Sequence, residues 1–123
     1  MDYSQLSDQE INAMVGKIFS KDGLSIIASD GNAVIHEYAD CGEFKGICLG
    51  WKVFDPCNNP ADAWPIIVDN KIKIEPVRRV RNYNEWYEEW DASVNSPHFC
   101  ESHKNPLRAA MICFLLMQDA NHA

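Results

Sequence analysis

Apolar residues at helical spacing mark both ends of this chain. Ser7-Asp8-Gln9-Glu10 has the form of a capping box, in which Ser7 caps a helix and Glu10 reaches back to it. Apolar residues three and four positions apart then predict a helix to about Phe19. At the other end, Pro106 opens a segment that is apolar nearly all round to about Asp119. We expect a deeply packed helix there, with Met111, Phe114 and Leu115 in the core.

Short β-branched and alternating runs occupy the middle of the chain. Residues 24–28 and 33–38 flank Asp30-Gly31-Asn32, which is typical of a turn, so they predict a hairpin. Residues 47–54 predict a third strand, and the polar segments 39–46 and 95–104 are predicted to be loops. Two further strands are predicted at 71–75, which alternates cleanly, and at 83–94, where a short helix is the alternative.

A polar loop, Asp55 to Asn59, joins the third strand to a central helix that we expect to run from Pro60 to about Asn70. Asn59 can cap this helix, and Pro60 suits its first position. Asp62 lies in the first turn, where the helix dipole favours a carboxylate. The predicted order is therefore α-β-β-β-α-β-β-α. This order favours an α+β fold, an α/β/α sandwich with one antiparallel sheet of four to five strands and three helices.

Composition narrows the class of protein. The 123 residues carry a net charge of −7 and are 46% hydrophobic, which predicts one globular domain, 1–123. The acidic balance disfavours binding to double-stranded nucleic acid. No apolar run reaches the roughly 20 residues of a membrane helix, and Met1-Asp2-Tyr3-Ser4 does not resemble a signal peptide. The five cysteines are irregularly spaced, so we expect free thiols and a cytoplasmic protein.

The loop–helix junction is the leading candidate for a binding site. Its polar side chains and Trp64 surround a helix N-terminus, and Trp51 lies just upstream, so a flat, nucleotide-like ligand could stack on an indole. The structural alternative is that Asn59 caps, Asp62 completes a capping box and Trp64 fills the core. Capping leaves Asn58 without a structural role, which favours the interpretation of the junction as a ligand-binding site. The predicted ligand-binding residues are Asp55, Asn58, Asn59, Asp62, Trp64, Trp51 and Arg108.

Arg108 belongs to this set because of its charge. A cation in the first turn of a helix is locally unfavourable. We therefore expect Arg108 to pair with Asp62 or to face an anionic ligand.

Two further clusters are weaker candidates for chemistry. His98, Cys100 and His103 offer metal ligands within six residues, but without a paired Cys-x-x-Cys motif a polar surface loop is preferred, and no metal or cofactor is predicted. Cys57 precedes a helix N-terminus and could act as a nucleophile with a histidine. Because no protease-like signature surrounds Cys57, an inert thiol is the preferred interpretation and the protein is predicted not to be an enzyme.

Basic and aromatic residues also alternate near Arg78-Arg79-Val80-Arg81. Together with Tyr83, Trp86, Tyr87 and Trp90 they could bind single-stranded nucleic acid or a phosphate. Interleaved Glu85, Glu88, Glu89 and Asp91 oppose this, so we favour charges paired across a sheet.

Three blocks resemble the NinX-like family of lambdoid phage and prophage proteins: residues 1–8, 57–67 and 105–111. The resemblance implies an α/β/α sandwich and a phage-encoded accessory protein, and supplies no mechanism. The leading hypothesis is a binder of a small ligand at 55–64, in host takeover or counter-defence. The alternatives are a module that inhibits a host enzyme through its acidic and aromatic surface, and a thiol- or carboxylate-dependent enzyme. Exposed sheet edges also make a homo-oligomer a candidate assembly.

Overall fold

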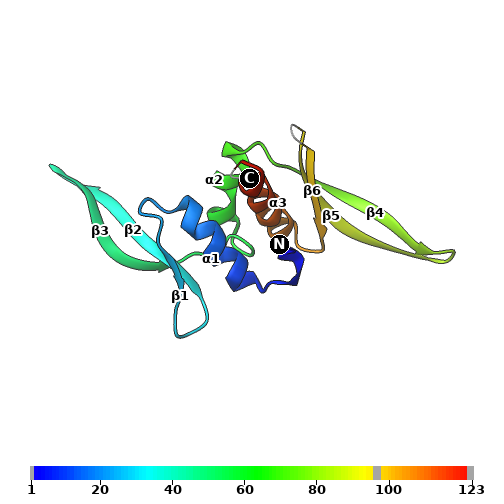
Figure 1. The fold of residues 1–123 in the computed structure, drawn as a ribbon, viewed down its shortest axis with the longest axis horizontal. Coiled ribbons are helices and arrows are strands. Elements are labelled where there is room, and N and C mark those ends of the chain that lie inside the picture. The colour runs from blue at the N-terminus through cyan, green and yellow to red at the C-terminus, as the bar shows by residue number, and fades with distance from the viewer. Residues whose placement is uncertain (1, 96–97, 122–123) are drawn as a thin grey trace.

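Three helices separate two small β-sheets in the computed structural model, which describes residues 2–95 and 98–121, without the side chains of 95 and 98–100 (Figure 1). The helices are α1 (Asp8–Phe19), α2 (Pro60–Asp69) and α3 (Pro106–Asn121), and a 3-10 turn spans Tyr3–Gln5. The strands are β1 (Ser25–Ile27), β2 (Ala33–Cys41), β3 (Phe44–Val53), β4 (Lys73–Asn82), β5 (Glu85–Asn95) and β6 (His98–His103). Hairpins β2–β3 and β4–β5 project from opposite ends of the helical centre.

Local sequence signals explain where the helices begin. The Ser7 hydroxyl accepts the Glu10 N–H at 3.2 Å, and the Glu10 carboxylate accepts the Ser7 N–H at 3.2 Å, so the capping box is confirmed. Asn59 caps α2 by accepting the Ala61 N–H at 3.0 Å. The predicted ends of all three helices are confirmed to within one or two residues.

The sheets are antiparallel, with strand orders β1-β2-β3 and β4-β5-β6. The prediction of one sheet in a sandwich is therefore wrong, although the α+β class and the hairpin at 24–38 are confirmed. Helix α2 connects β3 of the first sheet to β4 of the second and packs on α3, so the helices lie between the two sheets.

Both predicted loops contain strand residues. Strands β2 and β3 continue into 39–46 as far as Cys41 and Phe44, and β6 occupies 98–103, where a loop was expected. Polar composition misled both predictions. Strand β6 is an edge strand whose backbone pairs with β5, and its Ser102 hydroxyl contacts the Asp91 carboxylate, so polar side chains do not disfavour it there.

Helix α3 lies at the centre of the core. Its residues Arg108 to Leu115 are all buried, which confirms the prediction of a deeply packed helix. Residues 109–115 join Ile11 and Val15 of α1, Ile66 and Ile67 of α2, and Ala92 and Val94 of β5 in one hydrophobic cluster. Within the described part of the chain, no helix has the length and apolar character that crossing a bilayer requires.

Candidate functional site

Asn12 of α1 holds the loop that leads into α2. Its side chain is completely buried, and both ends of its amide are used. The Asn12 Nδ2 donates to Asp55 Oδ1 at 2.7 Å, and the Asn12 Oδ1 accepts the Cys57 N–H at 3.0 Å. One amide therefore holds the loop conformation. This role could not be predicted, because Asn12 lies within an otherwise ordinary helical pattern.

Asn58 has a structural role that we did not predict. Its Nδ2 donates to Asp8 and to Asp55, both at 3.1 Å. Its Oδ1 accepts from Asn105 Nδ2 at 3.2 Å, and the same Nδ2 donates to the Cys57 carbonyl at 2.7 Å. Asn58 therefore connects the starts of α1 and α3 to the loop, and the argument that it was free for a ligand is wrong.

Arg108 pairs with Asp8 and not with Asp62. The Arg108 Nη1 lies 2.6 Å from Asp8 Oδ1, and its Nη2 donates to the carbonyls of Ser4 and Leu6. Burial raises the pKa of Asp8, but hydrogen bonds from Asn58 and Arg108 and the guanidinium charge give a net lowering. The cation at the start of α3 is therefore compensated by a carboxylate at the start of α1.

Asp62 stabilises the junction in a different way from the predicted capping box. Its carboxylate accepts the Asp55 N–H at 2.9 Å, which closes the loop onto the first turn of α2. We use the name polar junction for the connected residues Asp8, Asn12, Asp55, Asn58, Asn59, Asp62, Asn105 and Arg108. Their hydrogen bonds are made largely to one another and to backbone groups, so the polar junction joins the three helices.

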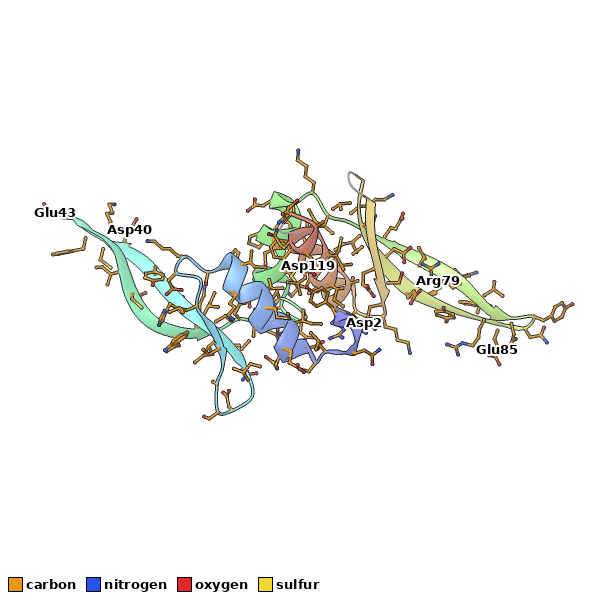
Figure 2. The ribbon with its side chains drawn as sticks, in the orientation of Figure 1. Asp2, Asp40, Glu43, Arg79, Glu85 and Asp119 are labelled. Atoms are coloured by element: carbon orange, nitrogen blue, oxygen red, sulfur yellow. The ribbon has the colours of Figure 1, made fainter. Side chains whose placement is uncertain are left out.

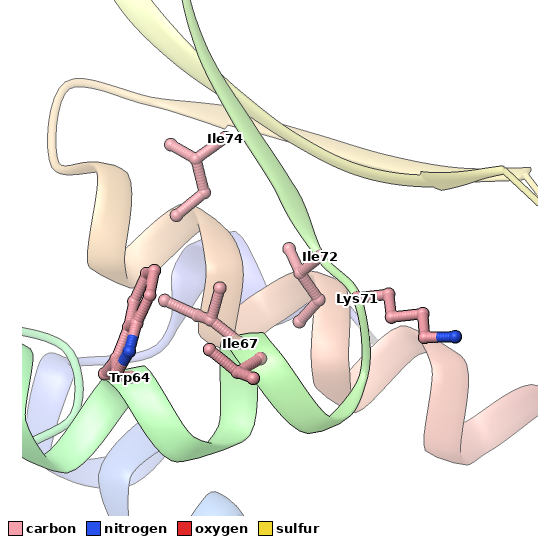
Figure 3. Close-up of a pocket in the computed structure, with 6 residues that line it drawn as sticks. Trp64, Ile67, Lys71, Ile72 and Ile74 are labelled. Carbon is pink, nitrogen blue, oxygen red and sulfur yellow. The ribbon is translucent and has the colours of Figure 1, made fainter.

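Trp64 is 63% exposed, so the alternative in which it fills the core is wrong. It lies at one side of an open apolar pocket of about 310 Å³ (Figure 3). The pocket is lined by Trp64, Ile67, Val68, Lys71, Ile72 and Ile74. We missed the last five, although the spacing of Trp64, Ile67 and Val68 by three and four residues places them on one helix face.

Trp51 lies on the projecting hairpin β2–β3, and its described ring contact is with His36, at 3.8 Å between centroids. His36 Nδ1 lies 2.6 Å from Asp22 Oδ2, and the Tyr38 hydroxyl donates to the same oxygen at 2.7 Å. These bonds lower the pKa of Asp22, chiefly through His36, and raise that of Tyr38 to about 12. They attach the hairpin to the turn that follows α1.

The Cys57 thiol is fully buried, and burial raises its pKa to about 12. A thiol in this state is a poor nucleophile at neutral pH, so the geometry opposes the thiol-enzyme hypothesis. Of the three residues considered as candidate metal ligands, His98 and Cys100 have side chains outside the described residues. His103 Nδ1 accepts the Asn105 N–H at 2.9 Å. Among described residues, no group of three or more His, Cys, Asp or Glu side chains is placed to hold a metal.

Two of the three arginines of hairpin β4–β5 form ion pairs across the sheet, in line with the predicted pairing of charges. Arg78 lies 3.5 Å from Glu88, and Arg79 contacts Glu89 at 2.5 Å and Asp91 at 2.7 Å. Figure 2 shows Arg79 on the projecting part of the hairpin. These pairs compensate the charges of Arg78 and Arg79 and leave aromatic surface exposed beside them.

These observations define the class: an α+β protein in which a polar junction of three helices separates two three-stranded sheets with projecting hairpins. The family model described as "Bacteriophage P22, NinX" matches residues 2–118, so the chain belongs to the phage P22 NinX family. No curated protein and no solved structure matches the chain.

Proposed function

We propose that this phage protein acts by binding a host protein through the outer part of hairpin β4–β5, without catalysing a reaction. The observation that carries the proposal is a sheet face that begins in the core and continues into solvent. Near the helices this face contains Ala92 and Val94, which are buried in the core cluster. Ala92 is paired with Ile74, which is half-buried and also packs on that cluster.

The strand register shows how the face continues along the hairpin. Residues two apart on a strand, and residues opposite each other on paired strands, share a face. From Ala92 outward, the face therefore includes Trp90 with Pro76, then the ion pair of Arg78 with Glu88, and then Trp86 with Val80. Val80 is 77% exposed and Trp86 is 56% exposed, whereas Ala92 is fully buried. The face thus continues beyond the helices that cover its base, with its outermost apolar residues, Val80 and Trp86, separated from Trp90 and Pro76 by one ion pair.

The residues around this outer face are those found at energetically important protein interfaces. The Arg78 guanidinium lies over the Trp86 ring at 4.0 Å on this face, and that of Arg81 lies over the Tyr87 ring at 4.8 Å on the opposite face of the hairpin. Tyr83 at the turn is 98% exposed. Tryptophan, tyrosine and arginine dominate such interfaces, because they bury large area while retaining polar groups. We name Val80, Tyr83 and Trp86 the hairpin patch.

Affinity capture from host lysate tests this proposal, using the double variant Val80→Ser with Trp86→Ser. The matched control is Phe44→Ser, which removes an exposed aromatic residue, 70% accessible, from the other hairpin. We expect a specific host protein to be recovered with the wild type and with Phe44→Ser, and recovery to fall at least about tenfold with the double variant, as for loss of interface anchors. Equal recovery by all three would contradict the proposal.

A small ligand beside the polar junction is the second candidate function, favoured by the open pocket at Trp64. In this function the polar side chains that we predicted to bind the ligand would instead position α2 and the Trp64 indole; these are Asp55, Asn58, Asn59, Asp62 and Arg108. Trp51 lies on a separate surface, so any contact that it makes with a ligand would be made there. The ligand could be a host signalling nucleotide sequestered during host takeover or counter-defence. Native mass spectra before and after denaturation test this function. A small mass that is lost on denaturation, and is absent from Trp64→Ala, is expected.

A further inference from the structure

We infer that the side of the sheet β1-β2-β3 that faces away from α1 is covered by the same side of a second copy of the chain. This surface includes neither the hairpin patch nor the pocket on α2, so the inference is independent of both functions proposed above. Strand register defines the surface. Ile26, Val34 and Val53 are paired across the three strands and form one row, and His36 with Trp51 forms the next row. We use the name outer face for these five residues.

Helix α1 covers the other side of this sheet. A Cβ atom at Gly16 of α1 would lie 2.6 Å from the Ser25 hydroxyl oxygen and 3.0 Å from Ile35 Cγ2, so both side chains face the helix. Ile35 belongs to the core cluster. Val34, the residue before it on β2, points to the opposite side of the sheet and is not part of that cluster. The outer face therefore lies outside the core.

The polarity of the two sides is the reverse of that expected for a sheet with one side in solvent. Such a sheet normally has apolar residues toward the core and polar residues toward water. Here the charged residues Lys52 and Glu37 share the side of Ile35, where they lie 3.8 Å apart. The outer face contains no Asp, Glu, Lys or Arg, and its one histidine, His36, is paired with Asp22. An apolar sheet face that turns away from its helix marks an interaction surface.

Charge favours a second copy as the occupant of this surface. The chain has a net charge of −7, so two copies repel one another over much of their surface. The outer face adds little to that repulsion, because the ion pair at its His36 is internal to each copy. It also offers a charged partner no free charge to pair with, whereas a row of aliphatic side chains is complementary to itself. Two identical sheets can therefore stack across a two-fold axis at the usual spacing of about 10 Å.

The exposed area of the outer face predicts a weak dimer. Ile26, Trp51 and Val53 are 49%, 48% and 52% exposed. Half of an indole is about 100 Å² and half of an aliphatic side chain about 50 Å², so the three supply about 200 Å² of apolar surface per copy. That area forms the centre of an interface smaller than the standard of about 800 Å² per partner. Because the two sheets lie at opposite ends of the helical centre, such a dimer leaves both hairpin patches free (Figure 1).

Sedimentation equilibrium of the full chain tests this inference, with a reducing agent present because Cys41 and Cys48 are exposed. We expect a monomer–dimer equilibrium with a dissociation constant on the order of 10 to 100 µM, as for a small interface. Added salt should strengthen the dimer, because it screens the repulsion between acidic copies. Val53→Glu should weaken the dimer at least about tenfold, because it places a charge in the apolar centre of the interface.

Val80→Glu is the matched control for Val53→Glu. It adds the same charge at an exposed valine of β4, in the other sheet, and so reproduces the change in net charge without altering the outer face. We expect its dissociation constant to equal that of the wild type. A second measurement needs no variant. Dilution of the wild type should shift the ¹H–¹⁵N signals of the Val34 and Val53 amides and of the Trp51 indole.

The inference is overturned if the wild type remains a monomer up to about 500 µM, well above the expected dissociation constant. It is also overturned if the two Val→Glu variants weaken the dimer equally, since net charge and not the outer face would then govern association. If Val53→Glu does not fold, the dilution spectra of the wild type decide. Shifts confined to other surfaces, such as the indole of Trp64, would show that the copies meet elsewhere and would contradict the inference.

The pocket on α2 that includes Trp64 takes no part in this assembly. In Figure 3, Trp64 and Ile67 lie on α2, and Ile72 and Ile74 lie on the segment that follows it. The outer face is on β1, β2 and β3. Trp64→Ala should therefore leave the dissociation constant of the dimer unchanged, and a loss of the dimer in this variant would contradict the inference.

Discussion

Arg108 and Asp8 form a 2.6 Å ion pair between residues 100 positions apart in the sequence. Each lies in the first turn of its helix, α3 for Arg108 and α1 for Asp8. A carboxylate is stabilised at a helix N-terminus, whereas a guanidinium is destabilised there. The Asp8 carboxylate therefore compensates the unfavourable position of the Arg108 guanidinium at the start of α3. The polar junction is built around this contact.

Removing Arg108 should destabilise the protein strongly. Arg108→Ala leaves the Asp8 carboxylate without its cation and the carbonyls of Ser4 and Leu6 without their donor. The Arg108 side chain is only 8% exposed, so we expect a loss of about 3 kcal/mol in the free energy of unfolding, measured with urea. Arg78→Ala breaks an exposed pair and should cost less than about 1 kcal/mol. Equal losses would show that the Arg108 pair is not structural.

Asn12 should matter more than Asn58 for stability. Asn12→Ala removes the partner of the buried Cys57 N–H and one donor to Asp55, for an expected loss of about 2 kcal/mol. Asn58→Ala removes bonds that water can replace at an exposed site, for an expected loss below about 1 kcal/mol. Urea unfolding of the two variants makes the comparison. A larger loss from Asn58→Ala would contradict the described network.

Asp22 should control the ionisation of Tyr38. The hydrogen bond to Asp22 is the main reason that the pKa of Tyr38 is raised from 10.0 to about 12. A raised native pKa means that this bond stabilises the fold fully below pH 10 and that the stabilisation is lost as the pH rises toward 12. Asp22→Asn should return the pKa of Tyr38 toward 10, measured by ultraviolet absorbance of tyrosinate. An unchanged titration would argue against the contact.

The cysteines should differ sharply in reactivity. Cys41 and Cys48 are exposed, whereas Cys57 is buried and its pKa is raised to about 12. At pH 8 the thiolate fraction of Cys57 should be about a thousandfold smaller than that of an ordinary thiol. Brief alkylation followed by peptide mass spectrometry should therefore label Cys41 and Cys48, and label Cys57 only in denaturant. Rapid labelling of native Cys57 would revive a role as nucleophile.

Local signals in the sequence were sufficient to place the helices. Ser7, Asn59 and Pro106 each act within one turn of the helix they begin, so no distant contact is needed to recognise them. The paired charges of hairpin β4–β5 were also predictable, because a cluster of arginines is followed closely in the sequence by a cluster of carboxylates. Strand β6 was missed because its pairing with β5 depends on the backbone, which a polar sequence does not reveal.

The candidate site could be predicted only in part, because its contacts are distant in sequence. Asp55, Asn58, Asn59, Asp62 and Arg108 do gather at the polar junction. Their partners Asp8 and Asn12 lie in α1, and no spacing rule links them to the loop. The exposure of Trp64 could not be predicted either, because an indole beside an apolar run ordinarily predicts burial. Packing of α2 on α3 decides which helix face remains open.

Site-specific photo-crosslinking in the host bacterium is the most direct test of the central claim, that the hairpin patch binds a partner. A benzophenone amino acid is placed at Tyr83, and at Gln5, in the 3-10 turn before α1, as an exposed control outside the hairpin. We predict that position 83 gives a discrete crosslinked species with a host protein, and that the species disappears when Val80 and Trp86 are both changed to serine. Crosslinks of equal yield from Gln5, or none from position 83, would contradict the account.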